Sequence, residues 1–173
     1  MHHAAARRQL GATLIESSIV LAIAAVALGL AAPSFQQTHE LRRLEGAAAQ
    51  LETDLQYTRS LAVARNETLR VAFVGTACYV VHSGGPADCT CADDGSAQCT
   101  GSPAVHRVVR LGRIGISSNS RSIAFDAVKG TVTPTATVRL AAADGREIRQ
   151  IVNLMGRIRS CSPAPALPGY RAC

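Results

Sequence analysis

The sequence predicts an α+β protein in which one long N-terminal helix is followed by an antiparallel β-sheet. Up to Ala62 the chain holds an apolar run and then a helical stripe, whereas after Asn66 short β-type runs alternate with turn residues. The expected organisation is a leader (1–11), an apolar transmembrane helix (12–32), its amphipathic continuation (33–67) and a β-rich globular region (68–173).

The apolar segment 12–32 is long enough to cross a bilayer once. A helix of this length extends about 31 Å, close to the roughly 30 Å of the hydrocarbon core. The short basic leader before it favours retention of that end in the cytoplasm. A cleaved secretory signal, with small residues such as Ala31 and Ala32 at the cut, is the alternative. Glu16 argues against it, because a carboxylate inside an apolar run needs a partner there.

The residues after Ser34 have the periodicity of an amphipathic helix. Spacings of three and four place one stripe on a single face: Leu41, Leu44, Ala48, Leu51, Leu55, Thr58 and Ala62. Charged residues, Glu52 and Asp54 among them, fall mostly on other faces. We expect the stripe to pack against a sheet of the same subunit, with a coiled-coil partner as the alternative.

Several β-type runs follow the helix. They cover residues 69–74, 78–82, 106–111, 122–125, 131–140, 147–154 and 157–161. Asp144-Gly145 between two alternating runs predicts a tight hairpin. Pro134 has no N–H to give to a sheet ladder, so its run is expected at a sheet edge or broken in two.

Six cysteines in a chain this short indicate an oxidising compartment. We expect Cys161 to pair with Cys173, because this disulfide closes a Pro-rich tail that has no other reason to be ordered. The pairing of the others stays open at this point, except that Cys89 with Cys91 has poor geometry. These others are Cys78, Cys89, Cys91 and Cys99.

A metal site built from Cys89, Cys91, Cys99 and His82 or His106 is the alternative for the second cysteine group. Its spacing is not the repeated Cys-x-x-Cys of structural zinc, so we expect neither a metal nor a cofactor. The sequence contains no nucleophile elbow, phosphate loop or paired-carboxylate constellation. We therefore do not expect an enzyme.

Positive charge is concentrated in the C-terminal part of the chain. The net charge is +6 overall, −3 over residues 34–104 and +8 over residues 105–173. Seventeen of the 18 basic residues are arginines, whose planar group suits bidentate contacts to phosphate. With six aromatic residues and no Trp, the chain lacks a base-stacking platform for single-stranded nucleic acid.

The run 147–161 reads as a strand, a tight turn and a second strand. Gly156 supplies the backbone freedom for the turn, and in an extended segment Arg157 and Arg159 share one face while Ile158 points to the core. Two such groups, about 7 Å apart, match successive phosphates of a nucleic-acid strand. Charge alone adds three arginines to this patch: Arg146, Arg149 and, if the tail folds back, Arg171.

The segment Gly11-Ala12-Thr13-Leu14-Ile15-Glu16 resembles the signal of type IV pilins and pseudopilins. The resemblance implies a pilin-like fold, an inner-membrane helix curved or locally melted near Pro33, and cleavage by a prepilin peptidase between Gly11 and Ala12. It also implies that Glu16 pairs with the N-terminal amine of a neighbouring pilin, since an ammonium group neutralises a buried carboxylate well. Ala12 stands where the family most often has Phe, and its N-methylation stays open.

Two further segments resemble the GspH/FimT branch of this family. Residues 55–66 carry its Arg-Ser-x-Ala element followed by Arg-Asn, and Gly156-Arg157-Ile158-Arg159 matches the Gly-Arg-x-Arg motif of FimT-type minor pilins, which bind DNA during natural transformation. The resemblance implies a minor pilin with a periplasmic domain that joins a pilus at the cell surface and binds DNA phosphates non-specifically. The alternative is a structural minor pilin or type II secretion pseudopilin that primes or caps a filament without binding DNA.

Overall fold

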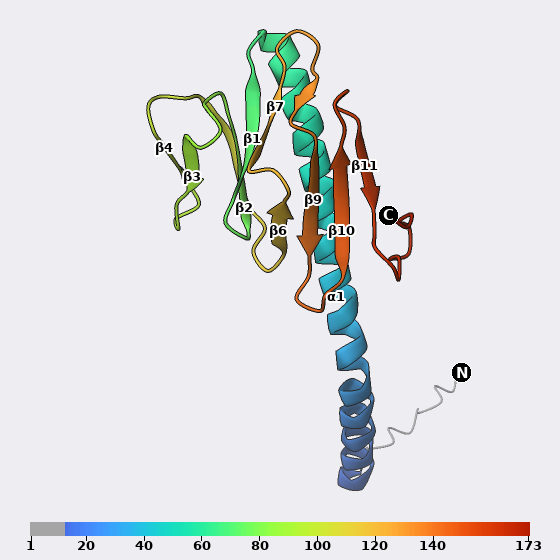
Figure 1. The fold of residues 1–173 in the computed structure, drawn as a ribbon. Coiled ribbons are helices and arrows are strands. Elements are labelled where there is room, and N and C mark those ends of the chain that lie inside the picture. The colour runs from blue at the N-terminus through green and yellow to red at the C-terminus, as the bar shows by residue number, and fades with distance from the viewer. Residues whose placement is uncertain (1–12) are drawn as a thin grey trace, which may run out of the picture. The chain divides into compact units, whose positions relative to one another are not determined.

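The computed structural model describes residues 13–173, apart from the side chains of residues 30–34 (Figure 1). One helix, α1 (Leu14–Arg65), runs through Pro33 without a break. The resemblance implied a helix that is curved or locally melted near Pro33; the continuous helix excludes melting of the backbone there, and the curvature stays a prediction. The chain divides into two compact units, Met1–His39 and Glu40–Cys173.

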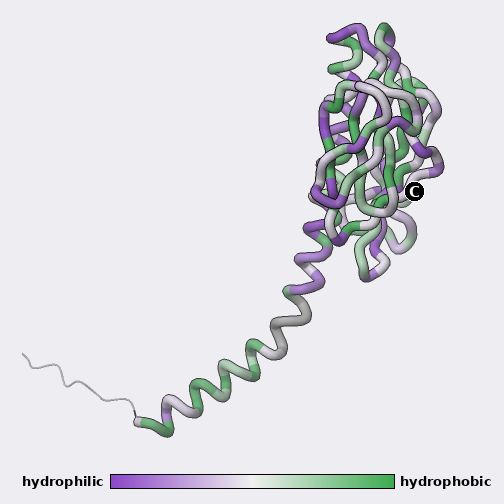
Figure 2. The backbone as a smooth tube through the Cα atoms, turned by 90° about the vertical axis from the view of Figure 1, so that its left-hand side faces the viewer, coloured by the Kyte–Doolittle hydropathy of each residue, from purple (hydrophilic) through white to green (hydrophobic). Residues whose placement is uncertain are grey.

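The part of α1 in the first unit is largely apolar, as Figure 2 shows, and Ile19, Leu21 and Val26 are exposed on it. Among the side chains that the structure describes, no helix has both the length and the apolar character to cross a membrane. The expected span 12–32 includes Ala12 and residues 30–32, which lie outside that set, and the span stays a prediction. The leader 1–11 and the cleavage point at Gly11 also lie outside the described residues.

The second unit is built around the C-terminal half of α1. The predicted stripe is buried there, with Leu44, Leu51 and Leu55 at 0% exposure, and it forms one core with side chains of the strands. Packing within the same subunit is therefore confirmed against the coiled-coil alternative. Asp54 was wrongly expected on a polar face, since it is 1% exposed and bonded to strand residues.

The strands form two main antiparallel sheets and a small hairpin, where the sequence predicted one sheet. The first sheet has the order β5-β2-β1-β7-β8, with β5 (Val105–Arg110), β2 (Cys78–His82), β1 (Leu69–Val74), β7 (Ser122–Phe125) and β8 (Val132–Thr133). The second sheet has the order β11-β10-β9-β6, with β11 (Ile158–Cys161), β10 (Glu147–Val152), β9 (Ala136–Ala141) and β6 (Gly115–Ser118).

Pro134 separates the two sheets. The predicted run 131–140 is broken there into β8, which ends the first sheet, and β9, which lies inside the second. This confirms the prediction from the missing N–H of proline. The Asp144-Gly145 hairpin is also confirmed, because it joins β9 to β10 with Glu147 opposite Ala141.

The small hairpin consists of β3 (Cys89–Cys91) and β4 (Ala97–Cys99), which the sequence did not predict as strands. Two disulfides hold it: Cys89–Cys99 across the hairpin and Cys78–Cys91 back to β2. Its small core contains Val80 of β2. Disulfides take the place of a larger core in this segment.

Candidate nucleic-acid interface

The predicted arginine motif lies on a hairpin at the edge of the second sheet. Strands β10 and β11 pair with Ile151 opposite Arg159 and Val152 opposite Ile158. Ile158 is half-buried and packs on the core, whereas Arg157 and Arg159 are exposed. Because side chains alternate along a strand, Arg159 lies on the outer face of the sheet, and Arg157, one residue before β11, lines the same surface as Arg159, as expected.

The turn of this hairpin is fixed against the end of α1. The N–H of Gly156 donates to the carbonyl of Asn153 (2.9 Å), and the N–H of Arg157 donates to Asn153 Oδ1 (2.8 Å). A Cβ on Gly156 would lie 2.8 Å from the carbonyl oxygen of Gly130 and 3.0 Å from Arg59 Nε. Gly156, with a φ of 73°, is therefore a packing position, and the structure gives it no surface for a ligand.

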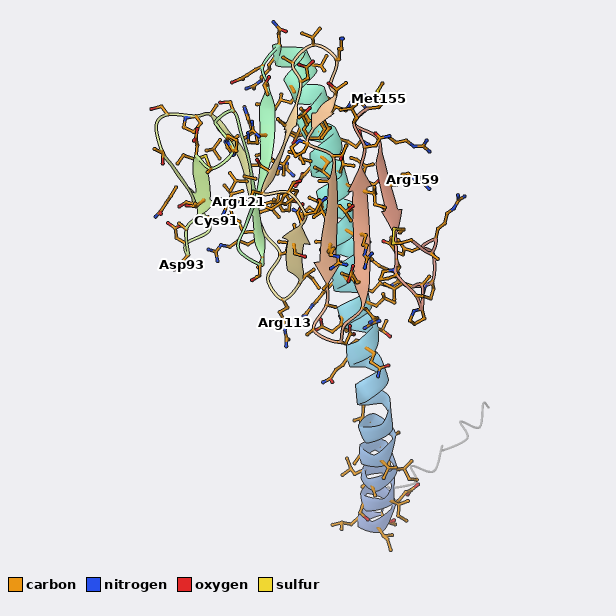
Figure 3. All side chains as sticks on the ribbon, viewed as in Figure 1. Cys91, Asp93, Arg113, Arg121, Met155 and Arg159 are labelled. Atoms are coloured by element: carbon orange, nitrogen blue, oxygen red, sulfur yellow. A yellow bond between two sulfur atoms is a disulfide. The ribbon has the colours of Figure 1, made fainter. Side chains whose placement is uncertain are left out.

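Three arginines line one groove of about 560 Å³. Arg157 and Arg159 come from the β11 side of the hairpin, and Arg171 comes from the C-terminal tail. Figure 3 shows Arg159 on the side of the molecule formed by β11. Within residues 13–173, none of the three guanidinium groups has an acidic partner. The groove is therefore a concentration of uncompensated positive charge.

The tail folds back as the sequence analysis required. The predicted disulfide Cys161–Cys173 is present, and Ser162 forms a parallel bridge with Ala172. The N–H of Ser162 donates to the carbonyl of Arg171 at 2.9 Å. Arg171 thus belongs to the groove, in agreement with the expectation made from charge.

The structure does not bring Arg149 into the groove. Its Nε donates to Glu147 Oε1 at 2.5 Å, and the same carboxylate lies 3.5 Å from Arg139 Nε. Arg139, opposite Arg149 in the register, shares the outer face and was missed by the sequence analysis, although the alternation of β9 could have indicated it. Glu147 thus neutralises much of the charge in the middle of this face.

Arg146 also lies outside the groove, in the turn that joins β9 to β10. Its side chain bonds to Asp144 within the β9–β10 turn. These hydrogen bonds hold the pKa of the Asp144 carboxyl below its usual value and raise the pKa of the Arg146 guanidinium. The inference that net positive charge would bring Arg146 to the patch was wrong, because the local acidic neighbour engages it.

The position of β11 is set by buried polar contacts with α1. Gln150 is fully buried, and its Nε2 donates to the carbonyl of Ala48 at 3.1 Å. Ser160 Oγ lies 3.0 Å from both Gln150 Oε1 and Glu52 Oε2. These contacts fix the residue between Arg159 and Cys161, so the outward direction of the arginines is set by the fold.

The remaining predicted residues lie elsewhere. Glu16 is exposed in the first turn of α1, where its N–H donates to Thr13 Oγ1 at 3.3 Å. The cysteines proposed for a metal are all bound in disulfides. Within the described part of the chain, no group of three or more His, Cys, Asp or Glu side chains could hold a metal ion.

Comparison with known proteins gives two matches. Residues 47–156 match the model of a protein family described as type II transport protein GspH. Among solved structures, the crystal structure of the type IV minor pilin FimU of Pseudomonas aeruginosa matches with a TM-score of 0.52 at 20% identity, over 72% of this chain and 96% of that chain. No curated protein matches by sequence. The likeness to FimU shows the fold. The family match begins at Ala47, within the buried half of α1, and ends at Gly156.

Proposed function

The chain belongs to the GspH family of type IV minor pilins and pseudopilins, and from this premise we propose that its arginine groove binds the phosphates of DNA. The observation that carries the proposal is the convergence of Arg157, Arg159 and Arg171 on one groove without an acidic partner in the described chain. Three groups that are always charged suit a ligand with several negative charges, such as a chain of phosphates, better than they suit a single carboxylate.

The binding that this groove supports is independent of sequence. Arg159 is on β11 and Arg157 is two residues before it, in the extended lead into that strand, and a spacing of two extended residues places their guanidinium groups within reach of successive phosphates. The second sheet offers no helix that could enter the major groove of DNA. The arginine groove of the protein is lined by no aromatic side chain that could stack on a base. Contacts to phosphate position a protein on DNA without reading bases.

The test measures the affinity of the full-length chain, in detergent, for a fluorescent DNA duplex at several salt concentrations. We expect weak binding, and we expect the logarithm of the association constant to fall linearly with the logarithm of the salt concentration. The variant Arg157→Ala/Arg159→Ala should reduce that slope by about 1.8, since each phosphate contact contributes about 0.9. Binding of this variant equal to that of the parent at low salt would refute the proposal.

The matched control is Arg113→Ala/Arg121→Ala. Both residues are exposed, and Figure 3 shows them away from Arg159, on the β6 side of the molecule. This control removes the same charge and should leave the slope within 0.5 of the parent value, a margin of about half a phosphate contact. An equal loss in both variants would mean that net charge, rather than the groove, attracts DNA.

A structural role without DNA is the second candidate, and the description of the matching family, a type II transport protein, favours it. Here the chain would prime or cap a filament of pilins through α1 and Glu16. The Arg157→Ala/Arg159→Ala variant separates the two roles in cells. If cells with this variant lose DNA uptake but still make pili, the result favours DNA binding. If a deletion strain stops secreting enzymes and the variant restores their secretion, the result favours the structural role.

We further propose that the N-terminal region is cleaved and then anchors the chain in the membrane, as in other pilins. The proposal includes cleavage by a prepilin peptidase between Gly11 and Ala12, an inner-membrane helix at residues 12–32, and pairing of Glu16 with the terminal amine of a neighbouring pilin. Family membership supports it. Gly11→Val should leave the leader attached, which the size of the protein on a denaturing gel reports directly.

A further inference from the structure

The position of Arg171 depends on how the C-terminal tail is held. Leu167 and Tyr170 are half-buried and pack against the core, so the middle of the tail has its own attachment. Residues 171–173 are exposed and follow this attachment. Their fixed position therefore requires other contacts.

Those contacts are two backbone hydrogen bonds to Ser162, which follows β11, and a disulfide to Cys161, the last residue of β11. The N–H of Ser162 donates to the carbonyl of Arg171 (2.9 Å), and the N–H of Cys173 donates to the carbonyl of Ser162 (3.1 Å). The disulfide Cys161–Cys173 closes this ring, with a sequence separation of 12. Ser162 itself is anchored, because its Oγ donates to the carbonyl of Glu147 at 2.9 Å.

Electrostatics opposes this arrangement. Arg157, Arg159 and Arg171 line the same groove, and like charges within about 10 Å repel one another through water. The two backbone hydrogen bonds join the buried Ser162 to exposed tail residues, and a typical hydrogen bond makes only a small net contribution to stability. A covalent ring removes most of the alternative positions that a free tail would adopt to relieve the repulsion.

We propose that the Cys161–Cys173 disulfide is the positioning device that makes Arg171 the third arm of the phosphate site. This inference rests on the proposed DNA binding by Arg157 and Arg159. With the bond closed, the groove presents three guanidinium groups to the DNA backbone. With the bond absent, Arg171 leaves the groove and two groups remain.

The experiment compares full-length variants in detergent by their affinity for a fluorescent DNA duplex and by its salt dependence. Arg171→Ala and Cys161→Ser/Cys173→Ser should each lower the salt slope by about 0.9 and weaken binding at 50 mM salt by about tenfold. The variant that combines all three substitutions should lose no more than either alone, because both changes remove the same contact.

The matched control is Cys89→Ser/Cys99→Ser, which removes a disulfide from the β3–β4 hairpin and should keep the slope of the parent. Circular dichroism checks that each variant is folded. A second variant retains the bond: three glycines inserted between Arg171 and Ala172 free Arg171 from the clamp and should lower the slope as Arg171→Ala does.

Three outcomes would overturn the inference. They are a parent-like slope without the Cys161–Cys173 bond, a parent-like slope with the inserted glycines, and additive losses in the combined variant. Failure of the proposed function has a different signature, in which Arg157→Ala/Arg159→Ala keeps the affinity and slope of the parent. In that case the arginine groove does not hold DNA whatever the state of the tail.

Discussion

Arg59 Nε, near the end of α1, donates a hydrogen bond of 3.0 Å to the carbonyl oxygen of Gly130, which lies 71 residues further along the chain. Gly156 lies against this pair, so close that a Cβ there would overlap the carbonyl oxygen. The arginine of the Arg-Ser-x-Ala element and the glycine of the Gly-Arg-x-Arg element thus meet in one contact. It joins the helix end, the β7–β8 loop and the β10–β11 turn.

The first prediction is that Gly156→Ala destabilises the domain. A φ of 73° is unfavourable for alanine by about 1–2 kcal/mol, and the added Cβ would lie 2.8 Å from Gly130 O. We expect the free energy of unfolding to fall by about 3 kcal/mol, with the overpacking supplying the rest. Chemical denaturation of the variant and the parent measures this difference.

Gly145→Ala is the control for this prediction. Gly145 has a similar φ of 86°, but nothing lies within 4 Å of the position of its Cβ. It should therefore show the backbone cost alone, about 1–2 kcal/mol. Equal losses in both variants would show that the contact with Gly130 and Arg59 does not matter.

The second prediction concerns Asp54, which is buried between α1 and the first sheet. Its Oδ2 accepts a hydrogen bond from Tyr79 Oη at 2.7 Å, and its Oδ1 is paired with Arg107. Burial and the bond to Asp54 raise the pKa of Tyr79, which stays protonated as the donor. Asp54→Ala leaves this buried donor unpaired and should lower the free energy of unfolding by about 2–4 kcal/mol.

Asp93→Ala provides the comparison for Asp54→Ala. The Asp93 side chain is fully exposed and lies 3.6 Å from Arg110, in the geometry of a surface ion pair. Such pairs contribute less than about 1 kcal/mol. A loss for Asp54→Ala as small as that for Asp93→Ala would mean that the buried network adds nothing to stability.

Periodicity predicted α1, its buried stripe and most of the long strands, because these features repeat within a few residues. Asp54 shows the limit of this method. It lies beside the stripe, and the partners that satisfy its carboxylate, Tyr79 and Arg107, are 25 and 53 residues away. No local pattern contains that information, so a charged residue was placed outside a core that it helps to form.

The missed strands have a different cause. β3 and β4 have three residues each and are held by disulfides, and β6 contains two serines, so none shows an alternating apolar pattern. In the candidate site, alternation correctly predicted the shared face of Arg157 and Arg159. The pairing of Arg149 with Glu147 depends on rotamers and on the register with β9, neither of which charge counting can supply.

The third prediction is a pH dependence of stability through His82. This side chain is fully buried, and its Nδ1 accepts a hydrogen bond from the N–H of Gly84 at 3.0 Å. Burial, and then the nearby Arg70, lower the pKa of His82 below its ordinary value of 6.5, whereas Asp88 opposes the shift. At pH values between the pKa of His82 in the folded protein and the ordinary pKa of 6.5, the unfolded chain binds more protons than the folded chain. The contribution of His82 to stability is therefore full above pH 6.5 and is lost as the pH falls through the folded pKa.

The measurement is the free energy of unfolding of the parent and of His82→Gln between pH 7.5 and pH 5, a range chosen around the ordinary pKa. The parent should lose up to about 1.4 kcal/mol per pH unit more than the variant below pH 6.5. His39→Gln, at an exposed position, should follow the parent. Parallel curves for the parent and His82→Gln would show that His82 is not the titrating group.

The fourth prediction is a gain of DNA affinity when Glu147 loses its charge. The Glu147 carboxylate holds Arg149 and lies 3.5 Å from Arg139, and both arginines are on the outer face that carries Arg159. Glu147→Gln keeps the shape of the side chain and releases both groups to the DNA. Under the proposed function, binding should tighten and the salt slope should steepen by up to about 1.8, which anisotropy titrations measure.

Asp144→Asn tests whether position or net charge produces this gain. It changes the charge of the chain by the same amount and weakens one contact of Arg146, just before the start of β10. Arg149 lies opposite Cys161, which lines the groove, whereas Arg146 does not line it, so Asp144→Asn should leave the slope nearly unchanged. Equal gains in the two variants would show that long-range attraction dominates, and no gain in either would show that the DNA does not cross this face.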